Sequence, residues 1–194
     1  MLPYLLCIDF ETSGIDVREN KHQPISLGAI VVNSLTLEAE KEIYLECKFH
    51  EDRFEWSNQA EKVHGLSVEY LKDKGTMEEM ATKLLEFILP YFKQADAITI
   101  LGHNPAFDMN CLNIVMNEIG IKLKLSHRKL DTFSLGFGLF GAEDSDSFFK
   151  YVGVNRNQHN ALEDARATVK ALQLTRKIGN IYQFILEDPT ILSR

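Results

Sequence analysis

The chain has 194 residues, of which 45% are hydrophobic and 25% charged, the size and composition of one soluble domain over residues 1–194. Its net charge of −7 argues against a protein that binds duplex DNA through a broad basic surface. Its apolar runs are too short and too interrupted to span a bilayer. We expect no signal peptide, because Leu2-Pro3 follows Met1 without a basic region, and the cysteines (Cys7, Cys47 and Cys111) are odd in number and widely spaced. We therefore expect no disulfide framework, no membrane partner and a reducing, cytoplasmic location.

The first predicted element is a buried strand at Tyr4–Ile8, which is apolar throughout and runs into two carboxylates. Because side chains alternate between the two faces of a strand, Asp9 and Glu11 point to one face and Phe10 to the other. Two acids side by side at the end of a buried strand repel each other and resist desolvation. They require a compensating charge, most simply a divalent cation. The alternative is that the strand simply ends in a polar turn.

Two more strands follow at hairpin spacing. The segment Ile25–Asn33 is β-branched and partly alternating, and Lys41–Phe49 alternates polar with apolar residues. The turn between them is short enough for an antiparallel meander. Helical signals come next, with Gly65 as a helix stop, Ser67 as a fresh N-cap, and a capping box at residues 76–79 that starts an amphipathic helix.

The second half of the chain alternates short strands with helices. We expect a strand at Ala97–Leu101, a helix at Ala106–Ile119, a short strand around Lys129–Asp131, short helices at Phe133–Phe140 and Ser147–Val152, a long helix at Ala161–Ile178 and a separate last helix at Asn180–Leu186. This order predicts an α/β fold with a mixed five-stranded sheet, three antiparallel strands first and parallel strands after, flanked by helices. Ligands bind at the carboxyl ends of the strands in such sheets.

Two further acids and a histidine lie at helix starts. Asp108 is near the start of the helix after the fourth strand, where it could simply complement the helix dipole. Asp164 is on the buried face of the last long helix, as marked by Ala161 and Ala165, and an aspartate there is costly without a cation or strong donors. His159 precedes that helix and is either a cap or a proton acceptor.

We therefore expect four carboxylates to cluster, two from a strand end and one from each of two helix starts. Carboxylates suit hard cations such as Mg²⁺ or Mn²⁺, and the sequence has no paired Cys or His ligands of the kind that zinc prefers. Four of them can hold two ions about 4 Å apart, the arrangement used for in-line attack on phosphorus. A neutral histidine beside them could take a proton from the attacking water.

These residues resemble the motifs of the DEDD superfamily of 3′–5′ exonucleases, the DnaQ-like group with a ribonuclease-H-like fold. The first motif is matched by Asp-Phe-Glu-Thr at 9–12, the second by His-Asn-Pro-Ala-Phe-Asp at 103–108, and the third by residues 159–165. The histidine at position 159 places the chain in the histidine (DEDDh) branch. Two segments, 63–66 and 130–132, also resemble recurring family segments, so the similarity covers nearly the whole chain.

The resemblance implies roles for single residues. The metal ligands are Asp9, Glu11, Asp108 and Asp164, and the general base is His159. The residues expected to line the 3′-terminal nucleotide are Thr12, His64 and Phe107. Asp131 is expected to be a structural acid near the site or a cap for the helix that follows it.

The implied activity is metal-dependent 3′–5′ exonucleolytic hydrolysis at a single-stranded 3′ end, releasing nucleoside monophosphates, with DNA slightly favoured. The rival interpretations are an exoribonuclease that acts on RNA or short oligoribonucleotides and a non-catalytic nucleic-acid-binding module. The sequence is compatible with a homodimer and with a polymerase or repair protein as a partner, and it does not decide between them. Two departures bear on substrate preference: Ser26 stands where many relatives have glutamate, and an acidic loop spans Ala142–Asp146. The basic segment Lys122–Lys129 is either a solvated face or a guide for the nucleic-acid backbone.

Overall fold

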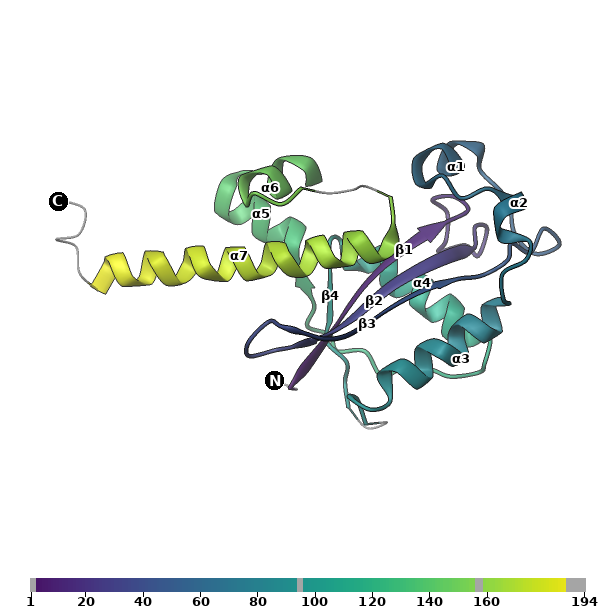
Figure 1. The fold of residues 1–194 in the computed structure, drawn as a ribbon, viewed down its shortest axis with the longest axis horizontal. Coiled ribbons are helices and arrows are strands. Elements are labelled where there is room, and N and C mark those ends of the chain that lie inside the picture. Colours follow the sequence, from purple (N-terminus) through teal and green to yellow (C-terminus); the bar gives the residue numbers. More distant parts are fainter. Residues whose placement is uncertain (1–2, 94–95, 156–158, 188–194) are drawn as a thin grey trace.

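The computed structural model describes residues 3–93, 96–155 and 159–187 (Figure 1). The elements in chain order are β1 (Tyr4–Thr12), β2 (Pro24–Asn33), β3 (Ala39–Glu46), α1 (Asn58–His64), α2 (Val68–Leu71), α3 (Met77–Ile88), β4 (Ile100–Gly102), α4 (Pro105–Asn117), β5 (Leu130–Asp131), α5 (Thr132–Phe140), α6 (Ser145–Tyr151) and α7 (Ala161–Glu187). No helix within the described ranges combines the length and the apolar character needed to cross a membrane.

The five strands form one mixed sheet in the order β3-β2-β1-β4-β5. Strands β1, β2 and β3 pair antiparallel, whereas β4 pairs parallel with both β1 and β5. The predicted fold class is confirmed. In this register Asp9 lies opposite Gly28 of β2, and Cys7 lies opposite Leu101 of β4. The carboxyl ends of β1, β4 and β5 therefore meet at one edge of the sheet.

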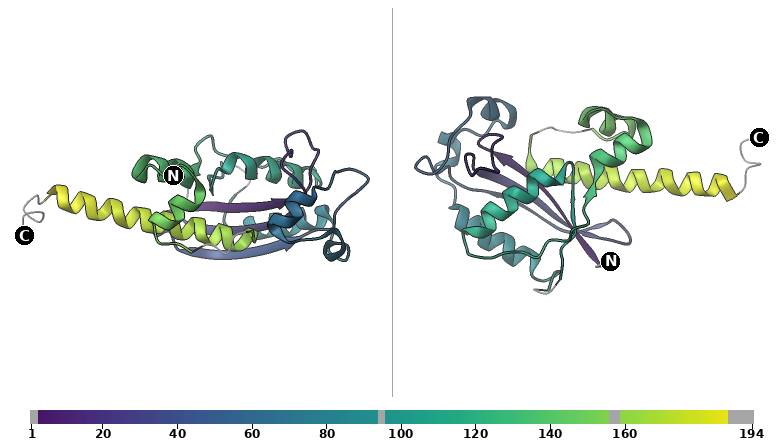
Figure 2. Two further views of the ribbon diagram at one scale, coloured as in Figure 1. Left: turned by 90° about the horizontal axis from the view of Figure 1, so that it is seen from above. Right: turned by 180° about the vertical axis from the view of Figure 1, so that it is seen from behind.

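Helices cover both faces of the sheet (Figure 2). On one face, Leu6, Ile8 and Phe10 of β1 pack in the larger core, which also contains the buried side chains of α3 and α4. On the other face, Leu5 and Cys7 pack against α7 in a second core. The strict alternation along β1 sends Asp9 and Glu11 to the α7 face.

Local capping signals decide where the helices begin and end. Thr76 and Glu79 form the predicted capping box, in which each side chain accepts the other residue's backbone N–H at 3.1 and 3.0 Å. Gly65, with φ of 73°, ends α1 in the left-handed conformation, and Ser67 caps α2.

Several predicted boundaries are wrong, among them the end of β1, which continues past the predicted Ile8 to Thr12. Strand β3 ends at Glu46, before the predicted Phe49, and β4 begins only at Ile100, although Ile98 forms an isolated bridge with Leu125. The separate last helix at Asn180–Leu186 does not exist, because α7 is one helix of 27 residues. Gly179 lacks the positive φ that ends a helix, and a single interior glycine costs only about 1 kcal/mol. The last part of α7 extends beyond the sheet, with residues 176–183 exposed (Figure 1).

Candidate active site

Three carboxylates converge at the carboxyl end of β1. Asp9 and Glu11 come from the strand, and Asp164 comes from the first turn of α7. One carboxylate oxygen from each lies within 4.8 Å of the other two. Asp164 is only 4% exposed, whereas both strand acids are half-buried. A group of three acids packed this closely is stabilised by a cation that several carboxylate oxygens can share.

A glycine allows α7 to approach so closely. Gly28 lies beside Asp9 in the β1–β2 ladder, on the face that α7 covers. A Cβ on Gly28 would lie closer than 3.0 Å to the backbone carbonyl of Ala161, in the first turn of α7. One turn further along, the Cys7 thiol donates to the carbonyl of Ala165 at 3.5 Å. Sequence reasoning missed Gly28, although a glycine inside a β-branched strand signals the close approach of another backbone.

Asp108 approaches the site from the opposite face of the sheet. It is buried in α4, and its Oδ1 accepts the backbone N–H of Phe10, the residue between the two strand acids, at 3.0 Å. Burial raises the pKa of the Asp108 carboxyl above its ordinary value; the hydrogen bond from Phe10 opposes this rise and the charge of Glu11 adds to it. Among the described residues, the group of mutually close carboxylates contains Asp9, Glu11 and Asp164 and does not include Asp108.

His159 is fixed to the acid cluster through its backbone. Its N–H donates to Oδ2 of Asp164 at 2.9 Å, and its φ of 77° is left-handed. The imidazole is exposed, so it can meet water at the edge of the site. His64 faces the same site from the end of α1, where burial lowers the pKa of its ring, and a hydrogen bond with the backbone of Thr12 opposes this shift.

The residues expected to contact a nucleotide line one pocket beside the acids. This pocket has a volume of about 400 Å³, and Thr12, His64 and Phe107 contribute to its walls together with Glu11. Sequence reasoning missed Ile15, which also lines the pocket and whose side chain is 84% exposed.

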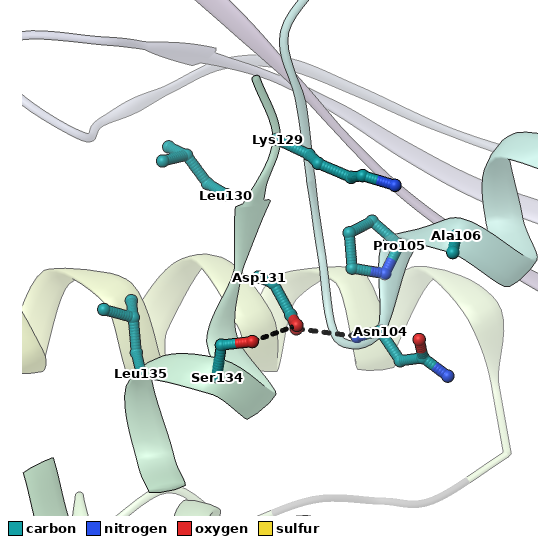
Figure 3. A pocket seen from close by; sticks show the side chains of 8 residues that line it. All are labelled: Asn104, Pro105, Ala106, Lys129, Leu130, Asp131, Ser134 and Leu135. Carbon is teal, nitrogen blue, oxygen red and sulfur yellow. Dashed lines mark hydrogen bonds between the residues drawn. The ribbon is translucent and has the colours of Figure 1, made fainter. Parts of the chain in front are cut away.

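Asp131 is a cap. Its carboxylate accepts the backbone N–H of Phe133 and the hydroxyl of Ser134, which fixes the first turn of α5. It also accepts the backbone N–H of Asn104 at 3.0 Å and holds that residue at the left-handed φ of 61° just before α4 (Figure 3). Part of the acidic loop is a cap as well, since Asp144 accepts the N–H of Ser147 at the start of α6.

Comparison with known proteins shows the family. The model of the RNase_T family, described as an exonuclease, matches residues 6–172. DNA polymerase III subunit epsilon of Rickettsia typhi is 32% identical over 168 residues, which covers 82% of this chain and 68% of that protein.

Two solved structures share the fold at low sequence identity. An exonuclease I structure superposes with a TM-score of 0.73 at 16% identity and covers 95% of this chain, which spans 43% of exonuclease I. The nuclease domain of 3′hExo, a DEDDh family member bound to rAMP, superposes with a TM-score of 0.64 at 15% identity, covering 92% of this chain and 93% of that domain.

Proposed function

Because this chain belongs to the RNase_T exonuclease family and its DnaQ-like group, we propose that it hydrolyses phosphodiester bonds at single-stranded 3′ ends and releases nucleoside monophosphates. The observation that carries the proposal is the convergence of Asp9, Glu11 and Asp164 at the carboxyl end of β1. The adjacent pocket supports it, because it places space for one nucleotide next to the acids.

The acid cluster fits hard divalent cations, since its donors are all carboxylate oxygens and one of the acids is buried. We propose two ions, Mg²⁺ or Mn²⁺, held by Asp9, Glu11 and Asp164 with Asp108 as the fourth acid. When bound, such ions lower the pKa of a water and stabilise the charge that develops on the leaving 3′ oxygen.

His159 is the proposed general base. Its exposed ring can reach a water at the edge of the cluster, and imidazole is the side chain that most readily exchanges a proton near neutral pH. The hydrogen bond between its backbone and Asp164 sets the position of the base relative to the acids. The 3′-terminal nucleotide is proposed to lie in the pocket, where Phe107 offers an aromatic face for the base and Thr12 and His64 offer polar contacts.

DNA is the substrate that we propose first, in line with the similarity to DNA polymerase III subunit epsilon. An RNA 3′ end is the second candidate, in line with the fold shared with 3′hExo, whose structure contains rAMP. A binding module without turnover is less well supported, because every motif acid and the motif histidine are present. We further propose a cytoplasmic location, consistent with three buried free thiols. A polymerase partner, by similarity to the epsilon subunit, and a homodimer stay open.

The decisive experiment is the degradation of matched 5′-labelled single-stranded DNA and RNA in the presence of Mg²⁺, Mn²⁺ or EDTA. We expect a ladder that shortens from the 3′ end with either metal and no cleavage in EDTA, and the faster substrate identifies the preferred nucleic acid. Asp9→Asn serves as the control against a contaminating nuclease. A folded protein that cleaves neither substrate in Mn²⁺ would overturn the proposed activity.

A further inference from the structure

A hollow of about 470 Å³ lies beside the catalytic edge of the sheet (Figure 3). It is enclosed by the start of α4, the short strand β5 and the start of α5. Its lining residues are Asn104, Pro105, Ala106, Lys129, Leu130, Asp131, Ser134 and Leu135. We call it the β5 hollow.

A second hollow lies between the β5 hollow and the nucleotide pocket. This second hollow, of about 320 Å³, shares Asn104 and Ala106 with the β5 hollow and is completed by residues 15–19 and Phe107. It shares Ile15 and Phe107 with the nucleotide pocket. The three hollows are therefore neighbours in a row that starts beside the acid cluster, passes the start of α4 and ends at β5, and the middle one is lined by Arg18 as well as by Asp16 and Glu19.

Among the described residues that line it, the β5 hollow contains one free ammonium group beside a carboxylate whose oxygens already accept protein hydrogen bonds. The carboxylate of Asp131 already accepts three hydrogen bonds, from the N–H groups of Asn104 and Phe133 and from the hydroxyl of Ser134. Lys129 is exposed, and its amine extends over the hollow toward Pro105 and Ala106 (Figure 3). The ammonium group is thus presented to the space while the only carboxylate among the lining residues is engaged by protein donors.

We propose that this row of hollows holds the nucleotides upstream of the 3′-terminal one, and that Lys129 binds a backbone phosphate in the β5 hollow. The inference rests on the proposed exonuclease function. A phosphate contact of this kind positions the strand without reading its sequence. Because Lys129 is one lysine at the end of the row of hollows, the affinity for an oligonucleotide should depend only weakly on salt concentration. A weak dependence agrees with the net charge of −7.

The fold separates Lys129 from the other lysines of the same basic segment. The carbonyl of Lys124 accepts the N–H of Ile98 at 2.8 Å, before the amino end of β4, whereas Lys129 directly precedes β5. Lys122 lines a different hollow, together with Phe92 and Leu123. Lys122 is therefore a matched control, because Lys122→Gln removes the same charge from the same segment at a site away from the row.

The test compares Lys129→Gln with Lys122→Gln on substrates of increasing length. The p-nitrophenyl ester of thymidine 5′-monophosphate has no upstream nucleotide and reports on catalysis alone. We expect Lys129→Gln to hydrolyse this ester like wild type and to lose about fivefold in kcat/KM on longer oligonucleotides. We also expect a change in the slope of log Kobs for oligonucleotide binding against log[salt], measured in EDTA. In Lys129→Gln this slope should become less negative by about 0.7, as expected for the loss of one phosphate contact to a single strand.

A scan of single uncharged methylphosphonates along the oligonucleotide then locates the contact. At one upstream position the modification should weaken wild type but not weaken Lys129→Gln further, because the two changes remove the same interaction. An equal loss on the nucleotide ester, an equal loss in Lys122→Gln, or oligonucleotide kinetics unchanged from wild type would each overturn the role of Lys129. If wild type cleaves nothing, the proposed function fails, and the binding measurement in EDTA still decides the role of Lys129.

Discussion

Gly28 in β2 lies against the backbone of Ala161, so closely that a Cβ on the glycine would overlap the alanine carbonyl. The same glycine is the ladder neighbour of Asp9. One residue without a side chain thus lets the first turn of α7 rest directly on the sheet, and Asp164 in that turn reaches the two acids of β1. The geometry of the acid cluster depends on this contact between backbones.

Gly28→Ala is therefore expected to push the start of α7 away from the sheet. Overpacking of this kind costs about 1–3 kcal/mol, which urea denaturation will measure as a lower free energy of unfolding. We also expect the Mn²⁺ affinity and kcat each to fall by about tenfold or more, because the positions of Asp164 and His159 both depend on the first turn of α7.

The matched control is Gly138→Ala in α5, where an added Cβ has no neighbour within 4 Å. That variant should keep full activity and gain up to about 1 kcal/mol, the difference between glycine and alanine in a helix. A Gly28→Ala protein that is destabilised but binds Mn²⁺ and turns over like wild type would show that the contact matters for folding alone.

Asp9→Ala is expected to abolish turnover while leaving the metal-free protein at least as stable as wild type, because it removes one of three mutually repelling carboxylates. Wild type should gain about 2.7 kcal/mol at a metal concentration 100 times the dissociation constant, and the variant should gain far less. Thermal unfolding with and without Mn²⁺ measures both effects. Activity equal to wild type would contradict the assignment of the site.

His159→Asn is expected to lower kcat by about 10²–10⁴-fold with metal binding retained, because the side chain no longer accepts a proton. Asparagine is preferred over alanine for this variant, since it tolerates the left-handed φ of 77° at this position. Steady-state kinetics and Mn²⁺ titration of the two proteins measure kcat and metal affinity separately. A variant that binds Mn²⁺ and turns over as fast as wild type would count against the role of His159 as the base.

Thr76→Ala is expected to lower the free energy of unfolding by about 1 kcal/mol, because it removes half of the capping box at the start of α3. Catalytic rates should not change, since α3 packs on the face of the sheet opposite α7. Thr82→Ala provides a control inside the same helix, where an exposed threonine is replaced without loss of a cap. If both variants lose equal stability, the capping box does not contribute as described.

Local patterns in the sequence determined a large part of this protein. The alternation along β1 put Asp9 and Glu11 on one face and Phe10 in the core, because the side-chain period of a strand is fixed. The capping box and the helix stop at Gly65 were equally readable, since their hydrogen bonds join residues only a few positions apart. The mixed sheet, with three antiparallel strands first and parallel strands after, followed from three strands at hairpin spacing and two more separated by helices.

Other features were decided only by the tertiary structure, because they join residues that are distant along the chain. No local pattern predicts the contact between Gly28 and Ala161. Nor does one predict that Asp108, from the opposite face of the sheet, accepts the backbone N–H of Phe10. The basic segment is continuous in sequence, yet Lys129 lines the β5 hollow near the start of α4, whereas Lys122 lines a different hollow. Strand pairing fixes which residues share an edge, and pairing is a property of the whole sheet.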